Sequence, residues 1–82
     1  MRQQVRLCDL CPGHQAVIRR LPETGLRQRL LDMGFLENSP VSCVGKSPMG
    51  DPCAYLVRGA VIALRRADSA GILIEEQGAI WD

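Results

Sequence analysis

The sequence has little of what nucleic-acid binders and membrane proteins need. Its ten basic and nine acidic side chains leave a net charge of +1, whereas a nucleic-acid-binding domain of this size usually carries a marked basic surplus. The aromatic residues are only Phe35, Tyr55 and Trp81, too few for a platform on which unpaired bases stack. The longest apolar run, residues 60–64, is far shorter than the ~18 residues that span a bilayer. We therefore expect no nucleic-acid partner and no direct membrane insertion.

The chain is also short. Its 82 residues can enclose one hydrophobic core, so we expect a single domain over 1–82. No segment resembles a secretory signal peptide, because the apolar runs are too short. We therefore expect a cytoplasmic location. Thiols stay reduced there, so the four cysteines do not indicate a disulfide framework.

The sequence lacks a recognisable catalytic constellation as well. His14 is the one histidine, and no candidate acid or base lies near it in sequence. None of the serines lies in a nucleophile-elbow motif. The segment GKSPMG (45–50) lacks the preceding glycine of a phosphate-binding G-x4-G-K-[ST] loop. We therefore expect a protein that is not an enzyme.

One segment has apolar residues at helical spacing. Leu26, Leu30 and Met33 lie at positions i, i+4 and i+7, which predicts an α-helix over about 26–33 with this face packed on the core. Gly34 follows the last turn. Glycine adopts without steric cost the left-handed conformation that commonly ends a helix, so Gly34 is the expected helix stop.

Extended patterning dominates the rest of the chain. Short apolar or alternating runs predict five strands, over about 15–21, 41–44, 53–57, 60–65 and 72–76. Only Arg58 and Gly59 separate the third and fourth of these, which is the length of a tight hairpin. Residues 66–71 are expected to form a turn or a single helical turn, and the tail 77–82 to be loosely attached. Five strands with one inserted helix predict a small, closed or nearly closed β-barrel.

The loop SPMGDP (47–52) is stiffened by its composition. Pro48 presets φ for the second position of a β-turn, and Gly50 suits the fourth. Pro52 has no N–H for a ladder hydrogen bond, so it must open a strand or lie on an edge. We expect an ordered turn that presents Met49.

Three segments together carry a resemblance to a known family. They are RLLDMGF (29–35), SPMGDP (47–52) and VRGAVIALRRADSAGILIE (57–75). In this order and spacing they resemble the FeoA family, small cytosolic partners of the bacterial ferrous-iron transporter FeoB, and the resemblance runs from about Leu7 to Glu75. The motif residues are Leu30, Asp32, Met33, Gly34, Pro48, Gly50, Asp51, Pro52 and Gly59. The chain departs from the pattern at Asn38, where glycine is usual, but asparagine tolerates the left-handed conformation.

The resemblance implies an SH3-like β-barrel without catalytic activity that supports ferrous iron uptake through contact with the cytosolic domain of FeoB. Such a contact is expected where the ordered loop and the helix end meet, because both are stiff and carry apolar groups. The apolar anchors that we expect are Leu31, Phe35 and Met49. Arg27 and Arg29 would form the charged rim, which chiefly sets rate and specificity. Phe35 is also expected to pack back on Leu30.

CDLCPGH (8–14) leaves a second function open. The family's opening pattern is matched by Leu7, Leu10, Pro12 and Gly13. Cys8 and Cys11 therefore fall on variable positions, and we expect them to be dispensable for folding. With His14 they can supply three of the four ligands that zinc prefers, so Zn or Fe(II) is a candidate metal.

Neither a complete metal site nor a redox pair is indicated, however. Cys43 and Cys53 are ten residues apart, so they do not form a second metal-binding pair and are expected to be small buried hydrophobes. A thioredoxin-type pair begins a helix, whereas Pro12 and Gly13 here lead into a strand. The alternatives to an adaptor are a metal-sensing or metal-carrying module, and a detached SH3-like domain of an iron-dependent transcription regulator. The absence of a DNA-reading helix counts against the latter. An oligomer is compatible with each of these functions.

Overall fold

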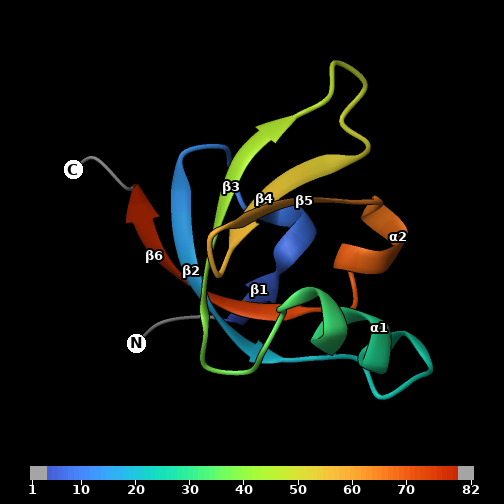
Figure 1. The fold of residues 1–82 in the computed structure, drawn as a ribbon. Helices are drawn as coiled ribbons and strands as arrows, with labels where there is room; N and C mark the ends of the chain where they lie inside the picture. Colours follow the sequence, from blue (N-terminus) through green and yellow to red (C-terminus); the bar gives the residue numbers. More distant parts are fainter. Residues whose placement is uncertain (1–3, 80–82) are drawn as a thin grey trace.

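A computed structural model describes residues 4–79 and shows one curved antiparallel sheet with short helices at one side (Figure 1). The strands are β1 (Gln4–Arg6), β2 (His14–Arg20), β3 (Pro40–Lys46), β4 (Cys53–Val57), β5 (Ala60–Leu64) and β6 (Leu73–Ala79). The helical segments are the 3-10 turn η1 (Leu7–Asp9), α1 (Leu26–Met33) and α2 (Arg66–Ser69). The strand order is β1-β6-β2-β3-β4-β5. Among the described residues, no helix is long and apolar enough to cross a membrane.

The structure confirms the predicted helix and places four of the expected strands close to their predicted bounds, but it corrects the first strand of the chain and the tail. The sheet has six strands, because β1 pairs with β6. The tail is not loosely attached over residues 77–79, since β6 continues to Ala79 and pairs there with His14 of β2. Residues 80–82 of the predicted tail lie outside the described residues.

The core lies inside the curve of the sheet and is closed by η1 and α1. Alternate positions of β4 point into it, and Cys53, Tyr55 and Val57 are buried. The Tyr55 hydroxyl donates a hydrogen bond to the Leu7 carbonyl over 3.4 Å, which links β4 to η1. Burying the ring with its hydroxyl satisfied avoids the cost of a lost hydrogen bond.

The end of α1 confirms the predicted glycine stop. Gly34 has φ 104°, and its N–H donates to the Leu31 carbonyl over 3.0 Å. The Phe35 N–H donates to the Leu30 carbonyl over 2.9 Å, which completes a Schellman motif. Phe35 and Leu30 are both buried in the core cluster. Asn38 has φ 71°, so the second predicted left-handed position is confirmed as well.

Two predicted turns also form. Arg58 (φ 51°) and Gly59 (φ 81°) are both left-handed, as a two-residue type I′ hairpin requires, and they join β4 to β5. In the loop 47–52, the Gly50 N–H donates to the Ser47 carbonyl over 2.8 Å and closes the β-turn. Asp51 Oδ1 accepts a hydrogen bond of 2.9 Å from the Arg66 N–H. This bond fixes the loop to the start of α2, so the loop is ordered.

Candidate protein-binding surfaces

The predicted anchors do not form one surface. Met49 is 92% exposed at the tip of the loop between β3 and β4, and this loop lies at the opposite end of the molecule from α1 (Figure 1). The physical reason is the length of β3. Its seven residues rise about 3.3 Å each and carry the chain roughly 20 Å away from the end of α1 before the loop begins. The expectation that the loop and the helix end meet is therefore wrong.

Phe35 is also corrected as an exposed anchor, because its side chain is 0% exposed and lies in the core. The Schellman motif turns this residue back over the helix, which buries it. Leu31 is half-buried and packs against the core. Arg27 pairs with Glu37, with 3.6 Å between NH2 and Oε1, while Arg29 is exposed. The α1 part of the predicted surface is thus Leu31 with two arginines.

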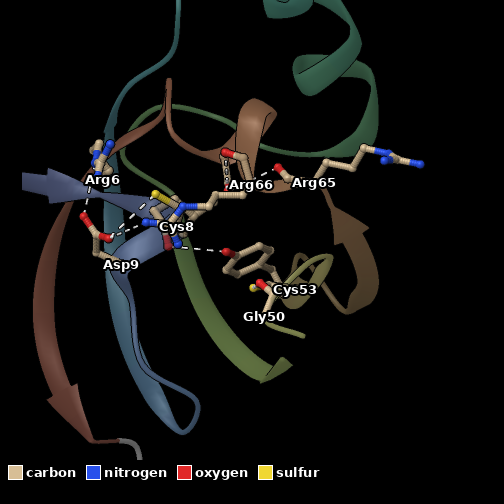
Figure 2. A network of polar contacts seen from close by, with 10 residues as sticks. Arg6, Cys8, Asp9, Gly50, Cys53, Arg65 and Arg66 are labelled. Atoms are coloured by element: carbon tan, nitrogen blue, oxygen red, sulfur yellow. Dashed lines mark hydrogen bonds and ion pairs between the residues drawn. The ribbon is translucent and has the colours of Figure 1, made fainter. Parts of the chain in front are cut away.

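The three candidate metal ligands do not converge. Cys8 is buried in η1 and donates a weak hydrogen bond to Asp9 Oδ1 over 3.8 Å (Figure 2), whereas Cys11 is exposed. His14 Nδ1 lies 2.6 Å from Glu76 Oε1, a partner 62 positions away that inspection of the local sequence missed. Within residues 4–79, no group of three or more His, Cys, Asp or Glu side chains is placed to hold a metal ion. These residues therefore do not fit a structural zinc or iron site.

The other two cysteines lie in the core, as predicted. Cys43 is 0% and Cys53 3% exposed. Burial raises the pKa of the Cys43 thiol, and burial also raises the pKa of the Tyr55 hydroxyl. A thiol that stays protonated is a poor nucleophile and a poor metal ligand. Cys43 therefore packs in the core as a small hydrophobe.

The burial of Cys8 changes the expectation that both thiols of CDLC are dispensable for folding, because only Cys11 is exposed. The two thiols should therefore respond differently to substitution. Cys8→Ser is expected to lower the free energy of unfolding by about 1–2 kcal/mol, since serine places a more strongly hydrated hydroxyl in the core. Cys11→Ser, the matched control, should leave it unchanged because Cys11 is exposed. Urea denaturation followed by circular dichroism, with chelator present, measures both. Equal midpoints would contradict the burial of Cys8, and unfolding of the parent by chelator alone would reveal a structural metal.

An apolar surface that the sequence analysis missed lies on the outer face of the sheet. Val44, Leu56 and Val61 are 47%, 39% and 65% exposed, and we call them the outer-face patch. Leu56 and Val61 are directly paired between β4 and β5. The sequence of β4 and β5 could have indicated this surface, because both strands are apolar at the positions that face the core and also at the positions between them. An open depression of about 410 Å³ adjoins the patch, and it is lined by Gln15, Pro40, Ser42, Leu56, Arg58 and Gly59.

A polar network joins the N-terminal turn to α2 (Figure 2). Asp9 accepts from Arg6 Nε over 3.2 Å and lies 3.7 Å from Arg66 NH2. The Arg66 N–H is in turn held by Asp51. Figure 2 shows that the neighbouring Arg65 side chain extends away from this network. Arg66 is thus engaged within the molecule, while Arg65 is directed to solvent.

The chain is similar to proteins of one family over most of its length. The family model described as "FeoA domain" matches residues 5–76. A Porphyromonas gingivalis protein named Fe(2+) transport protein A/Fe(2+) transporter FeoB fusion protein is 39% identical over 72 residues, which cover 87% of this chain. The chain spans only 8% of the length of that relative.

Solved structures agree with the fold. The FeoA-like protein of Clostridium acetobutylicum is 28% identical, with a TM-score of 0.84 over 100% of this chain and 93% of that one. FeoA of Stenotrophomonas maltophilia, solved in complex with zinc and described as a prokaryotic SH3 domain protein, is 24% identical, with a TM-score of 0.76 over 85% of this chain and 88% of that one. The mostly β, SH3-like fold expected from the sequence is confirmed.

Proposed function

Because the chain belongs to the FeoA family, we propose that it is a non-enzymatic, cytoplasmic accessory protein that supports ferrous iron uptake by contacting the cytosolic part of a FeoB-type transporter. The family assignment supports the broader role in ferrous iron transport. The contact itself is the proposal.

The observation that carries the proposal is the fused relative. In that protein, a segment 39% identical to most of this chain belongs to the same polypeptide as an FeoB transporter. Covalent linkage keeps two domains at high effective concentration, so a weak contact between them is sufficient. Such a contact needs a binding surface, and exposed apolar groups on rigid elements supply one.

The two parts of the predicted surface, Met49 and the α1 residues, lie apart and become separate proposals (Figure 1). Met49 is the most exposed large apolar side chain that the structure describes, and its loop is fixed by the bond between Asp51 and Arg66. A preordered apolar tip loses little conformational entropy on binding. The α1 surface has less exposed apolar area, because Leu31 is half-buried, and contributes mainly the charges of Arg27 and Arg29.

Met49→Ala is expected to weaken binding to the transporter's cytosolic domain by about 1–3 kcal/mol, because it removes an exposed apolar anchor. Arg29→Gln should chiefly reduce the salt dependence of binding, since rim charges act mainly through long-range attraction. Arg20→Gln is the matched control, an exposed arginine on β2 outside both surfaces. Titration calorimetry at two salt concentrations, with unfolding checked by circular dichroism, measures these effects.

The adaptor proposal fails if the two folded proteins give neither heat nor a spectroscopic shift at high micromolar concentration. That result would favour the metal-carrying alternative, for which the zinc complex of the Stenotrophomonas maltophilia protein is the precedent. Zinc titration of the parent and of Cys11→Ser would then test that alternative directly. The difference in exposure between buried Cys8 and exposed Cys11 weighs against the metal-carrying alternative.

A further inference from the structure

Strand β5 has a free backbone edge. It lies at one end of the sheet and, among the described residues, pairs only with β4. Val57 and Ala60 flank the two-residue turn and so form a hydrogen-bonded pair. Alternation along the ladder then directs the backbone N–H and C=O groups of Val61 and Ala63 away from β4. Neither residue makes a backbone hydrogen bond to another described element.

This edge lacks the features that usually protect one. Natural edge strands carry charges, prolines or bulges that discourage further pairing. β5 has the sequence AVIAL, with no charge or proline, and its register with β4 is unbroken. Ala60, Val61 and Ala63 are exposed. The opposite edge strand, β1, has only three residues and ends in an arginine. β5 is therefore the edge that is suited to accept another strand.

Positive charge flanks β5 at both ends. Arg58 precedes the strand and Arg65 follows it, and no acidic residue occurs from position 53 to position 67. Within the described part of the chain, neither arginine forms an ion pair. Asp9 and Asp51 are engaged with Arg66. At one end of the edge, Arg65 is exposed and directed to solvent (Figure 2). At the other end, the aliphatic part of the Arg58 side chain packs beside Gly34.

These charges disfavour a second copy of the chain as the occupant. Two β5 strands paired antiparallel about Ile62 would bring the turn that carries Arg58 in each copy beside Arg65 and Arg66 of the other, at both ends of the paired strands. The repulsion between these like charges opposes such a pair. An acidic segment meets the same two ends with favourable charge.

We infer that β5 is a docking edge for an extended, acidic segment of a protein partner, which adds to the sheet as a further strand. The segment pairs its backbone with Val61 and Ala63, and its carboxylates lie at the ends of the edge, where Arg65 and Arg58 supply positive charge. The inference rests on the adaptor role proposed above, because it assumes that the acidic segment belongs to a protein partner. It names a surface distinct from Met49 and from α1.

Nuclear magnetic resonance of the ¹⁵N-labelled chain tests the pairing. The probe is the acetylated nonapeptide EEVTVTVEE, and the charge-reversed control is KKVTVTVKK. The acidic peptide should slow amide hydrogen exchange at Val61 and Ala63 by about tenfold or more, because strand addition hydrogen-bonds these groups. The Ile62 amide, which already faces β4, should change little. Equal binding of both peptides, no response at millimolar peptide, or shifts at Leu56 without protection at Val61 and Ala63 would each overturn the inference.

Two variants with matched controls locate the contact. Ala63→Pro removes an outward N–H without removing a bond to β4, so the fold should persist while peptide binding is lost. Ala63→Ser keeps the N–H and should bind like the parent. Arg65→Glu should invert the preference toward the basic peptide, whereas Arg20→Glu on β2 should not. If Ala63→Pro fails to fold, the comparison of Arg65→Glu with Arg20→Glu decides. The inference is overturned if Arg65→Glu still prefers the acidic peptide to the same degree as the parent.

Binding of the transporter's cytosolic domain separates this inference from the adaptor role. If the parent and Ala63→Pro bind that domain equally well, the adaptor role stands and the docking edge is wrong for that partner. If the parent does not bind the domain but the acidic peptide protects Val61 and Ala63, the edge stands and the adaptor role fails.

Discussion

Phe35→Ala is expected to lower the free energy of unfolding by about 3–5 kcal/mol, the usual cost of emptying a phenylalanine site in a core. The side chain is 0% exposed and is among the largest that are fully buried. It also packs in the same core cluster as Leu30 at the end of α1. The substitution therefore leaves a cavity and removes the apolar contact that accompanies the Schellman motif.

This loss is large for so small a domain. At about 0.05–0.15 kcal/mol per residue, a chain of 82 residues has a total stability of roughly 4–12 kcal/mol. The melting temperature of Phe35→Ala should fall by about 12 °C or more, because each kcal/mol shifts it by about 4–8 °C at this size.

Met49→Ala is the matched control for Phe35→Ala. It also truncates a large apolar side chain that was expected to bind a partner, but this one is 92% exposed. Its free energy of unfolding should stay within about 0.5 kcal/mol of the parent, as for most surface substitutions. Urea denaturation followed by circular dichroism compares the two. If both variants unfold at the parent's midpoint, Phe35 is not the core residue described here.

The features that the sequence predicted correctly are local ones. The helix over 26–33 depends on side chains three and four positions apart, and its end depends on the conformational freedom of Gly34. The hairpin at Arg58 and Gly59 is likewise fixed by the length of its turn. In each case the deciding interactions lie within a few residues, so the pattern alone contains them.

The features that the sequence did not predict depend on pairing between distant parts of the chain. β1 has only three residues and no periodicity, and it is a strand because β6 lies beside it. The tail looked unattached because its partner, His14 of β2, lies more than sixty positions earlier. The contact between His14 and Glu76 arises from the same strand pairing.

The candidate surface was harder to predict than the fold, because exposure is a property of the whole molecule. Phe35 and Met49 are both large apolar residues beside a turn, yet one is buried and the other nearly fully exposed. The periodicity of apolar residues predicts which face of a helix packs on the core, but it does not predict which residues cover the end of the helix. In the same way, the apolar segment AVIAL predicts a strand, but only the strand order shows that it lies at an edge.

Gly34→Val is expected to lower the free energy of unfolding by about 2–3 kcal/mol, because valine must occupy φ 104°. A β-branched residue is a steric outlier at positive φ, and such strain costs about 1–3 kcal/mol. A side chain at this position also has a neighbour, since an added Cβ would lie 3.4 Å from Arg58 Cδ. The two methyl groups of valine extend beyond that Cβ and should displace the Arg58 side chain.

A graded series distinguishes backbone strain from crowding at Gly34. Gly34→Asn should be the least destabilising, because asparagine tolerates the left-handed region, although its side chain is larger than that of alanine. Gly34→Ala should fall between asparagine and valine. If strain governs, stability follows the order Asn, Ala, Val, and if crowding governs, alanine is the mildest. A valine variant that melts within a degree or two of the parent would show that the helix end does not depend on glycine at all.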